Sequence, residues 1–303
     1  MKRAITSAPR GAGGEFYQNE DLAVQRQADP PPFAALRPAG VEETLDCMTA
    51  ALAYFHERDD YRAVFLAAYR VITTQMQTAI RSTGHPFFHD PQWMSRVVGT
   101  FATLYFRSLR TFERPFSEER AWKLAHGLAI SKSSTVLQDV LLGVNAHIKY
   151  DLPVALEQNL HDVAHNQREL SMRRRDHERA NLLLARSITT LRSTIPHNYG
   201  GSLGVFDRGI LRVDVPVADM VGRYNRWRVW TDAVSLLRAP SADRRQAIIQ
   251  RMDMGSARTA EFIRRWFVPP WVGSEHLAAR CSDYSRLVVP TTEALPSRSH
   301  LTL

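Results

Sequence analysis

The sequence has few of the features that mark several large classes of protein. It has two cysteines in 303 residues, Cys47 and Cys281, which are too few for a disulfide framework or a cysteine metal cluster. No apolar run reaches the roughly 18 residues that a membrane-spanning helix requires. After Lys2 and Arg3 the N-terminal segment is polar and contains no apolar stretch, so we expect no secretory leader. These absences favour a cytoplasmic protein with reduced thiols and no membrane span.

Motifs of several enzyme classes are also missing. The sequence has no phosphate-binding Walker loop and no strand-flanked glycine fingerprint, and the stretch GGSLG at 200–204 is too weak a match to count as a motif. It lacks the Glu-x-x-His pairs of di-iron bundles. The pair Asp59-Asp60 has no third carboxylate, which argues against a metal-dependent terpene cyclase of the standard kind.

The excess of positive charge is spread along the chain. Lys and Arg number 39 against 31 acidic residues, which gives a formal net charge of +8. The one basic run, Arg173-Arg174-Arg175, is followed directly by Asp176 and then by Glu178. This pattern favours a basic surface around a pocket for an anionic small molecule, and we expect no nucleic-acid partner.

The periodicity of the apolar residues is helical. Hydrophobic residues make up 44% of the chain, enough for a sizeable core. They recur at helical spacing, as in the stripe Val64, Ala68, Ile72 and Met76, and no run alternates as strands do. We therefore predict an all-α, single-domain bundle of about eight to ten helices.

The bundle is predicted to have irregular segments at its ends and one glycine-rich segment inside it. We predict a flexible N-terminal arm over 1–38, a helical domain over 39–290 and a C-terminal tail over 291–303. The glycine-rich segment 196–214 is interpreted either as an ordinary long connection or as a mobile lid.

The segment 137–156, LQDVLLGVNAHIKYDLPVAL, sets three polar residues in an apolar helical run. His147 and Asp151 are four residues apart, so a continuous helix places both on one face, where they can share a hydrogen bond or bind one cation. Asn145 adds a potential hydrogen-bond donor to a developing oxyanion. Buried polar groups are unfavourable unless they are paired or used, so these three are the predicted catalytic residues.

Pro153 leaves the role of Asp151 open. A proline disrupts the preceding helical turn, so the helix is expected to kink or restart near 150–152. Asp151 then suits the N-cap of the next helix, a structural role. The alternatives are that Asp151 orients His147, or that His147 and Asp151 bind a divalent metal such as zinc.

Further polar and aromatic residues are candidates for ligand contacts. Additional metal ligands would come from His161, His165, Asp176 or His177, although the segment with His161 and His165 is hydrophilic and expected to be exposed. The predicted substrate-binding residues are Tyr69, Tyr105, Arg226 and Trp230. Packing of the Arg226 stem on Trp230 is the structural alternative for that pair.

The central segment LLGVNAHIKYDLPVAL resembles the motif GxNAHIxxDLPLAL of an uncharacterised family, number 5995 among the domains of unknown function. The segments that resemble further blocks of that family, in the same order, are VFLAAYRVIT, DPQWMSRVVGTFATLYFRSL, RAWKLA, DHERANLLLA and RWRVWTDAVSLL. The resemblance covers roughly 60–290. It implies an all-α domain whose site contains Asn145, His147 and Asp151. Thr103, Lys149 and Tyr150 depart from the family's pattern.

Three functions remain open from the sequence. The first is a cofactor-independent enzyme that uses acid–base catalysis on a mostly apolar small molecule, as a cyclase, isomerase or lyase of specialised biosynthesis. The second is a metal-dependent hydrolase, which a distant similarity to helical zinc phospholipases and single-strand nucleases suggests through a shared His-x-x-x-Asp pair. This sequence lacks the further His-x-x-x-Glu pair of those enzymes. The third is a non-catalytic binding or scaffold protein.

Overall fold

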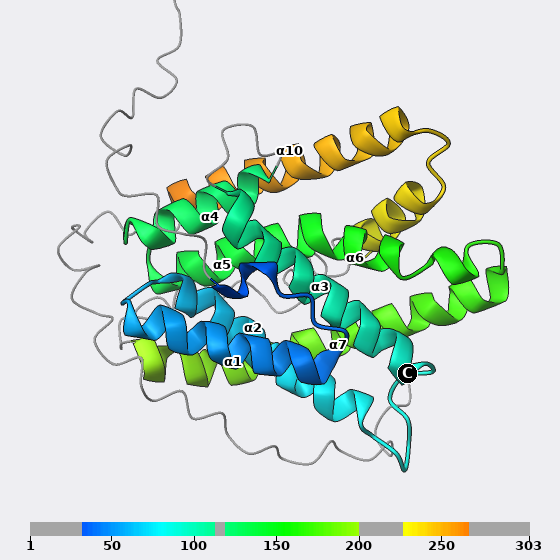
Figure 1. Cartoon of the computed structure of the whole chain (residues 1–303), viewed down its shortest axis with the longest axis horizontal. Helices are drawn as coiled ribbons and strands as arrows, with labels where there is room; N and C mark the ends of the chain where they lie inside the picture. The colour runs from blue at the N-terminus through cyan, green and yellow to red at the C-terminus, as the bar shows by residue number, and fades with distance from the viewer. Residues whose placement is uncertain (1–31, 113–118, 200–226, 267–303) are drawn as a thin grey trace, which may run out of the picture. The chain divides into compact units, whose positions relative to one another are not determined.

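The fold is all-α, as predicted. A computed structural model describes residues 32–112, 119–199 and 227–266, and every regular element in those ranges is helical (Figure 1). The α-helices are α1 (Val41–Glu57), α2 (Arg62–Ile80), α3 (Pro91–Thr111), α4 (Arg120–Ile130), α5 (Val136–Ala146), α6 (Leu152–Gln158), α7 (Gln167–Tyr199) and α10 (Ala242–Trp266), with a further helical segment at 227–237. The short elements are η2 (Pro32–Ala35), η3 (His147–Asp151) and η4 (His161–Val163).

Capping residues define where two of the helices begin. The Asp90 side chain accepts a hydrogen bond from the Trp93 backbone N–H at 2.8 Å, with Pro91 in the first turn of α3. At the start of α5, Thr135 and Gln138 form a reciprocal capping box. This box fixes the start of the helix that carries the central motif.

The largest core cluster lies where α2, α3, α4 and α5 meet. Its bulky members include Phe65 of α2, Tyr105 of α3 and Trp122 of α4. Helix α10 packs against both α4 and α5 and closes the side of α5 that faces away from α2 (Figure 1). The first half of the central motif therefore runs through the interior.

A second cluster fills the space between α3, α6, α7 and 227–237. It contains Trp93, Leu156, Leu183 and Trp230. Trp230 thus belongs to a different part of the core from Tyr69 and Tyr105, which lie in the first cluster.

Some of the predicted segments can be compared with the structure over only part of their length. Helix α7 begins at Gln167 and is continuous to Tyr199, so positions 196–199 of the segment interpreted as a connection or lid are helical. Within the predicted arm, Phe33 is 5% exposed and packs its ring on Tyr54 and Phe55, which anchors η2 in the core. The remainder of the arm over 1–31, the segment 200–214 and the tail lie outside the described residues. No described helix is long and apolar enough to cross a membrane.

Candidate functional site

His147 and Asp151 meet in the interior as their spacing predicts. His147 Nδ1 and Asp151 Oδ2 lie 2.8 Å apart, and the two side chains are 3% and 1% exposed. Both residues belong to η3, a π-helical turn that joins α5 to α6. The Leu152 N–H closes this turn by donating to the His147 carbonyl, five residues back. The turn therefore continues the helix instead of interrupting it.

The wider turn explains how Pro153 is accommodated without a break. Proline has no N–H and its ring crowds the carbonyl four residues earlier, and π-turns and kinks occur at such positions. Helix α10 holds the turn from outside, because Lys149 Nζ donates to Thr259 Oγ1 at 3.0 Å. Asp151 has helical backbone angles and its side chain makes no capping hydrogen bond. The N-cap interpretation of Asp151 is therefore wrong, and its carboxylate points to His147.

Trp122 of α4 completes the polar part of the site. Its indole Nε1–H donates to Asp151 Oδ2 at 2.9 Å, so one carboxylate oxygen contacts both the indole and the imidazole. Burial raises the pKa of Asp151 to about 8, while the hydrogen bond from Trp122 acts in the opposite direction. Burial also lowers the pKa of His147 well below its usual value, so the imidazole is neutral at pH 7.

Aromatic rings enclose the His147 imidazole. The Phe101 ring stacks on it with centroids 3.4 Å apart and planes at 5°. Tyr69 meets it edge-on at 4.5 Å, and the centroids of Phe65 and Tyr105 lie 5.9 and 6.0 Å away. Such packing fixes the orientation of the ring, which a group that transfers protons requires.

Three polar atoms in this enclosure have no hydrogen-bond partner: His147 Nε2, the Tyr69 hydroxyl and the Tyr105 hydroxyl. Buried polar atoms in native proteins are nearly always satisfied, so a group of three requires an explanation such as a bound molecule or a catalytic role. The structure thus brings two predicted substrate-binding residues, Tyr69 and Tyr105, to the predicted catalytic histidine. Nδ1 contacts Asp151, and Nε2 is the ring nitrogen without a hydrogen-bond partner.

Asn145 faces a different neighbour. Its amide Nδ2 donates to the Ser256 carbonyl at 2.9 Å and lies 3.3 Å from Ser256 Oγ, which joins α5 to α10. Both amide hydrogens are directed at Ser256 and not at the His147 ring. We therefore assign the Tyr69 and Tyr105 hydroxyls, instead of Asn145, as candidate donors to a substrate oxygen.

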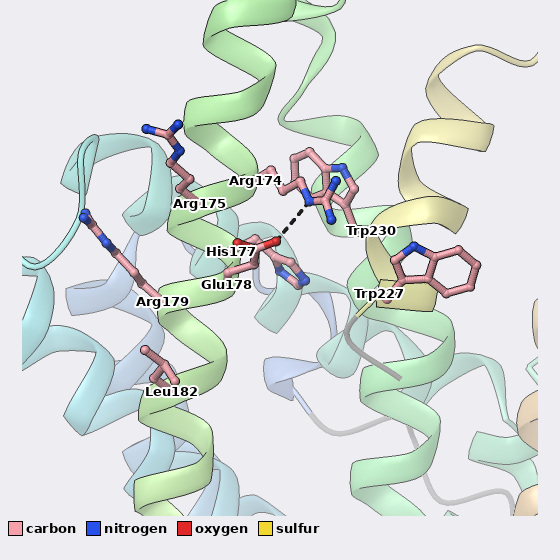
Figure 2. A pocket seen from close by; sticks show the side chains of 8 residues that line it. All are labelled: Arg174, Arg175, His177, Glu178, Arg179, Leu182, Trp227 and Trp230. Carbon is pink, nitrogen blue, oxygen red and sulfur yellow. Dashed lines mark hydrogen bonds and ion pairs between the residues drawn. The ribbon is translucent and has the colours of Figure 1, made fainter. Parts of the chain in front are cut away.

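The remaining predicted ligand residues lie elsewhere. Arg226 is outside the described residues. Trp230 stacks on His177, with centroids 5.7 Å apart, at the edge of a pocket of about 540 Å³ between α7 and 227–237 (Figure 2). In that pocket Arg174 pairs with Glu178 at 3.0 Å, as the dashed line in Figure 2 marks. Trp230 therefore lies in a different core cluster from Tyr69 and Tyr105.

The additional metal-ligand candidates also have other contacts. The His161 side chain is 62% exposed and contacts Glu157, and His165 is exposed, as expected from their hydrophilic segment. Both carboxylate oxygens of Asp176 accept backbone N–H groups, from His89 and Asp90. Within the described ranges, no three His, Cys, Asp or Glu side chains are grouped as metal ligands.

Gly143 is a residue of the central motif whose importance the sequence analysis did not detect. A Cβ atom on Gly143 would lie 2.2 Å from Cδ2 of Phe65, so the phenyl ring rests directly on this glycine. Trp122, Phe65 and Phe101 were missed as well, because they come from other helices. The only available signal was their position in apolar helical stripes, which every core aromatic residue shares.

A comparison with models of protein families agrees with the resemblance that the central motif shows. The sequence model of a family of unknown function, DUF5995, matches residues 41–266, about three quarters of the chain. The chain belongs to this family. No curated protein and no solved structure matches it. The DUF5995 match spans every helix that contributes to the His147 site, and the family's description assigns no reaction, so the site geometry is the basis for a functional proposal.

Proposed function

We propose that this DUF5995 protein is a cytoplasmic enzyme of specialised biosynthesis that performs acid–base chemistry on a small molecule, without a cofactor. Cyclisation, isomerisation and elimination are the reaction types that need only proton transfers of this kind. The observation that carries the proposal is the buried His147 Nε2, which has no partner while Nδ1 is held by Asp151. A histidine oriented by a carboxylate is a common general acid or base.

The pair presents Nε2 as a base or as an acid, depending on whether it holds one proton or two. With one proton, on Nδ1, Asp151 accepts that hydrogen bond and the lone pair of Nε2 takes a second proton from the substrate. Once Nε2 holds this second proton, the first can move from Nδ1 to Asp151, the carboxyl group then donates to Nδ1, and Nε2–H is the acid. Trp122 donates to Asp151 Oδ2 in either state and fixes the carboxylate. Asp151 and Trp122 are thus positioning residues, and His147 is the catalytic residue.

The surroundings of Nε2 favour a planar, mostly apolar substrate. Phe65, Phe101 and the two tyrosine rings supply apolar surface, and the tyrosine hydroxyls supply two donors that no protein group uses. Burial raises the pKa of Tyr69 well above its usual value, so its hydroxyl remains a neutral donor at pH 7. A carboxylate or enolate oxygen would receive these hydrogen bonds, in agreement with an anionic ligand.

Two other functions are each favoured by one observation. The burial of His147 favours a scaffold role. The residue is only 2% exposed, so a substrate reaches it only when neighbouring side chains move. A metal-dependent hydrolase is favoured by the carboxylate–histidine pair, which also orients metal-binding imidazoles. In that case Nε2 would bind the ion, and Nδ1 and Asp151 would not chelate it together.

The test uses a variant that deletes Nε2 and retains the pairing. In His147→Asn, the amide nitrogen can occupy the position of Nδ1 and donate to Asp151. Wild type, His147→Asn and the control Asn145→Ala are incubated with a metabolite extract in D2O, and mass spectrometry records consumed compounds and deuterium incorporation. Elemental analysis of protein purified without chelators runs in parallel.

We expect wild type and Asn145→Ala to transform the same compound and His147→Asn to lose at least 100-fold in rate, the scale of general acid–base catalysis. About one equivalent of metal that is lost in His147→Asn would establish the hydrolase instead. An extract that no protein changes, with metal well below one equivalent, would leave the scaffold function.

A further inference from the structure

A pocket of about 540 Å³ lies between α7 and 227–237, apart from the His147 site (Figure 2). Small-molecule sites in proteins have volumes of roughly 300–1,000 Å³. The described residues that line this pocket include none of the rings around His147, and its more buried tryptophan, Trp230, belongs to the second core cluster. A ligand in the pocket would therefore occupy a site of its own.

One part of the pocket is apolar and reaches the solvent. Its base is Trp230, which is 8% exposed and stacks on the His177 ring with the two planes at 30°. Trp227, about one helical turn earlier, is 53% exposed, and so is Leu182 of α7. Only three large apolar side chains in the described ranges are more than half exposed, and these are two of them. Exposed apolar surface that gathers at a pocket favours an apolar ligand.

Guanidinium groups outnumber carboxylates in the described lining. Arg174, Arg175 and Arg179 supply three positive charges, and Glu178 supplies one negative charge. Arg174 and Glu178 pair at 3.0 Å, but both side chains are about half exposed, so the pair stabilises little and can separate. Arg175 forms no ion pair with any acidic side chain that the structure describes. The excess of positive charge favours an anion.

The free positive charge lies across α7 from the apolar part. Figure 2 shows the side chains of Arg175 and Arg179 at one edge of α7 and the two tryptophans beyond the other edge. Arg175 and Arg179 are four residues apart, a spacing at which like charges repel, so an anion beside them would be stabilising. Arg179 is already positioned, because it donates to the Phe87 carbonyl at 3.0 Å. It also lies 3.7 Å from the buried Asp176, whose carboxylate oxygens accept two backbone N–H groups.

We propose that this pocket binds an elongated amphipathic anion, with a flat apolar body against Trp227 and an oxyanion at Arg175 and Arg179. The ligand is elongated because a helix with its side chains is about 10–12 Å across. The planar guanidinium fork matches carboxylate and phosphate groups, which share this chemistry. The site goes beyond the proposed function, because it requires no reaction at His147.

The probes for the test are biphenyl-4-carboxylate, its neutral carboxamide and biphenyl-4-yl phosphate. Calorimetry of the full chain measures their affinities, and the ¹⁵N indole signals of the tryptophans locate them, with Trp227→Leu as the assignment of one signal. We expect the carboxylate to shift the Trp227 and Trp230 signals. The carboxamide should bind at least about fivefold more weakly, the scale of one exposed charge contact. The tighter of the two anions identifies the oxyanion.

Matched variants separate the pocket from general effects of charge and apolar surface. Arg175→Gln should weaken the carboxylate about fivefold and leave the carboxamide unchanged. Arg168→Gln makes the same charge change in α7 outside the pocket and should leave both affinities unchanged. Trp227→Leu should weaken both probes, whereas Phe262→Leu, which removes an exposed ring from α10, should weaken neither.

Three results would overturn the proposal. The first is an absence of shifts at Trp227 and Trp230 with either anion at millimolar concentration. The second is equal affinity for the carboxylate and the carboxamide, and the third is equal weakening by Arg168→Gln and Arg175→Gln. His147→Asn should bind the probes as wild type does, so this proposal and the proposed function fail separately.

Discussion

Replacing Gly143 with alanine tests whether the wall of the His147 site is as tightly packed as the structure indicates. The added Cβ would lie 2.2 Å from Cδ2 and 2.3 Å from Cγ of Phe65, well inside van der Waals contact. Movement of the phenyl ring is restricted, because its centroid lies 5.5 Å from those of both Tyr105 and Trp122. Backbone or ring displacement must therefore accompany the substitution.

The expected magnitude is the difference between two opposing effects. Overpacking a core costs about 1–3 kcal/mol, and the tight enclosure of Phe65 favours the upper end. Alanine is favoured over glycine inside a helix by about 1 kcal/mol. The free energy of unfolding should therefore fall by about 2 kcal/mol, which lowers the melting temperature by roughly 4–8 °C for a domain of this size.

Urea unfolding of Gly143→Ala and of a matched control, Gly127→Ala, measures this change in the free energy of unfolding. Gly127 lies within α4 and has nothing within 4 Å of an added Cβ, so Gly127→Ala should gain about 0.5–1 kcal/mol. In the double variant Gly143→Ala/Phe65→Leu, the smaller leucine side chain leaves space for the added Cβ. The free energy of unfolding of the double variant should therefore fall by less than the sum of the two single decreases. If Gly143→Ala gains stability as Gly127→Ala does, the packing described around His147 is incorrect.

Three further predictions concern the polar groups. Asn145→Ala should lower the free energy of unfolding by about 0.5–1.5 kcal/mol, because it removes the hydrogen bond that joins α5 to the Ser256 carbonyl of α10, and circular dichroism of urea unfolding measures this. Trp122→Phe removes the indole donor and should raise the pKa of Asp151 further above about 8, read from the infrared carbonyl band of the protonated carboxyl group; an unchanged pKa would contradict the contact. Because burial raises the folded-state pKa of Asp139 to about 8, this group favours folding most below pH 4, and that contribution is lost as the pH rises to about 8. The free energy of unfolding should fall between pH 6.5 and 8 by up to about 1.4 kcal/mol per pH unit for this group, and Asp139→Asn should flatten the slope.

The sequence was sufficient for the fold class and for the pairing of His147 with Asp151. Helical periodicity is a local property, and a spacing of four residues places two side chains together in any helix. The role of Asp151 was harder to predict, because a proline two residues later is typical of the first turn of a new helix, whereas the structure continues the helix through a π-turn. Only the position of the Asp151 carboxylate, which points inward and contacts Trp122, distinguishes a partner of His147 from a helix N-cap.

The other residues of the site depend on tertiary contacts. Trp122, Phe65 and Phe101 come from three helices, and nothing in their own segments indicates that they surround an imidazole. Asn145 shows the converse. It is two positions from His147 in the sequence, and two residues in a helix are about 200° apart, so it faces α10.

The most direct test of the central claim is ¹⁵N NMR of the His147 ring in wild type and in Asp151→Asn, followed from pH 4.5 to 9. We predict a wild-type imidazole whose pKa lies well below its usual value, because the ring is buried, with Nδ1 in a hydrogen bond that Asp151→Asn weakens. We also predict that Nε2 has no hydrogen bond to a protein group. A ring that titrates near its usual value, or an Nε2 bound to a protein side chain, would contradict the assignment of His147 as the acid–base group of the site.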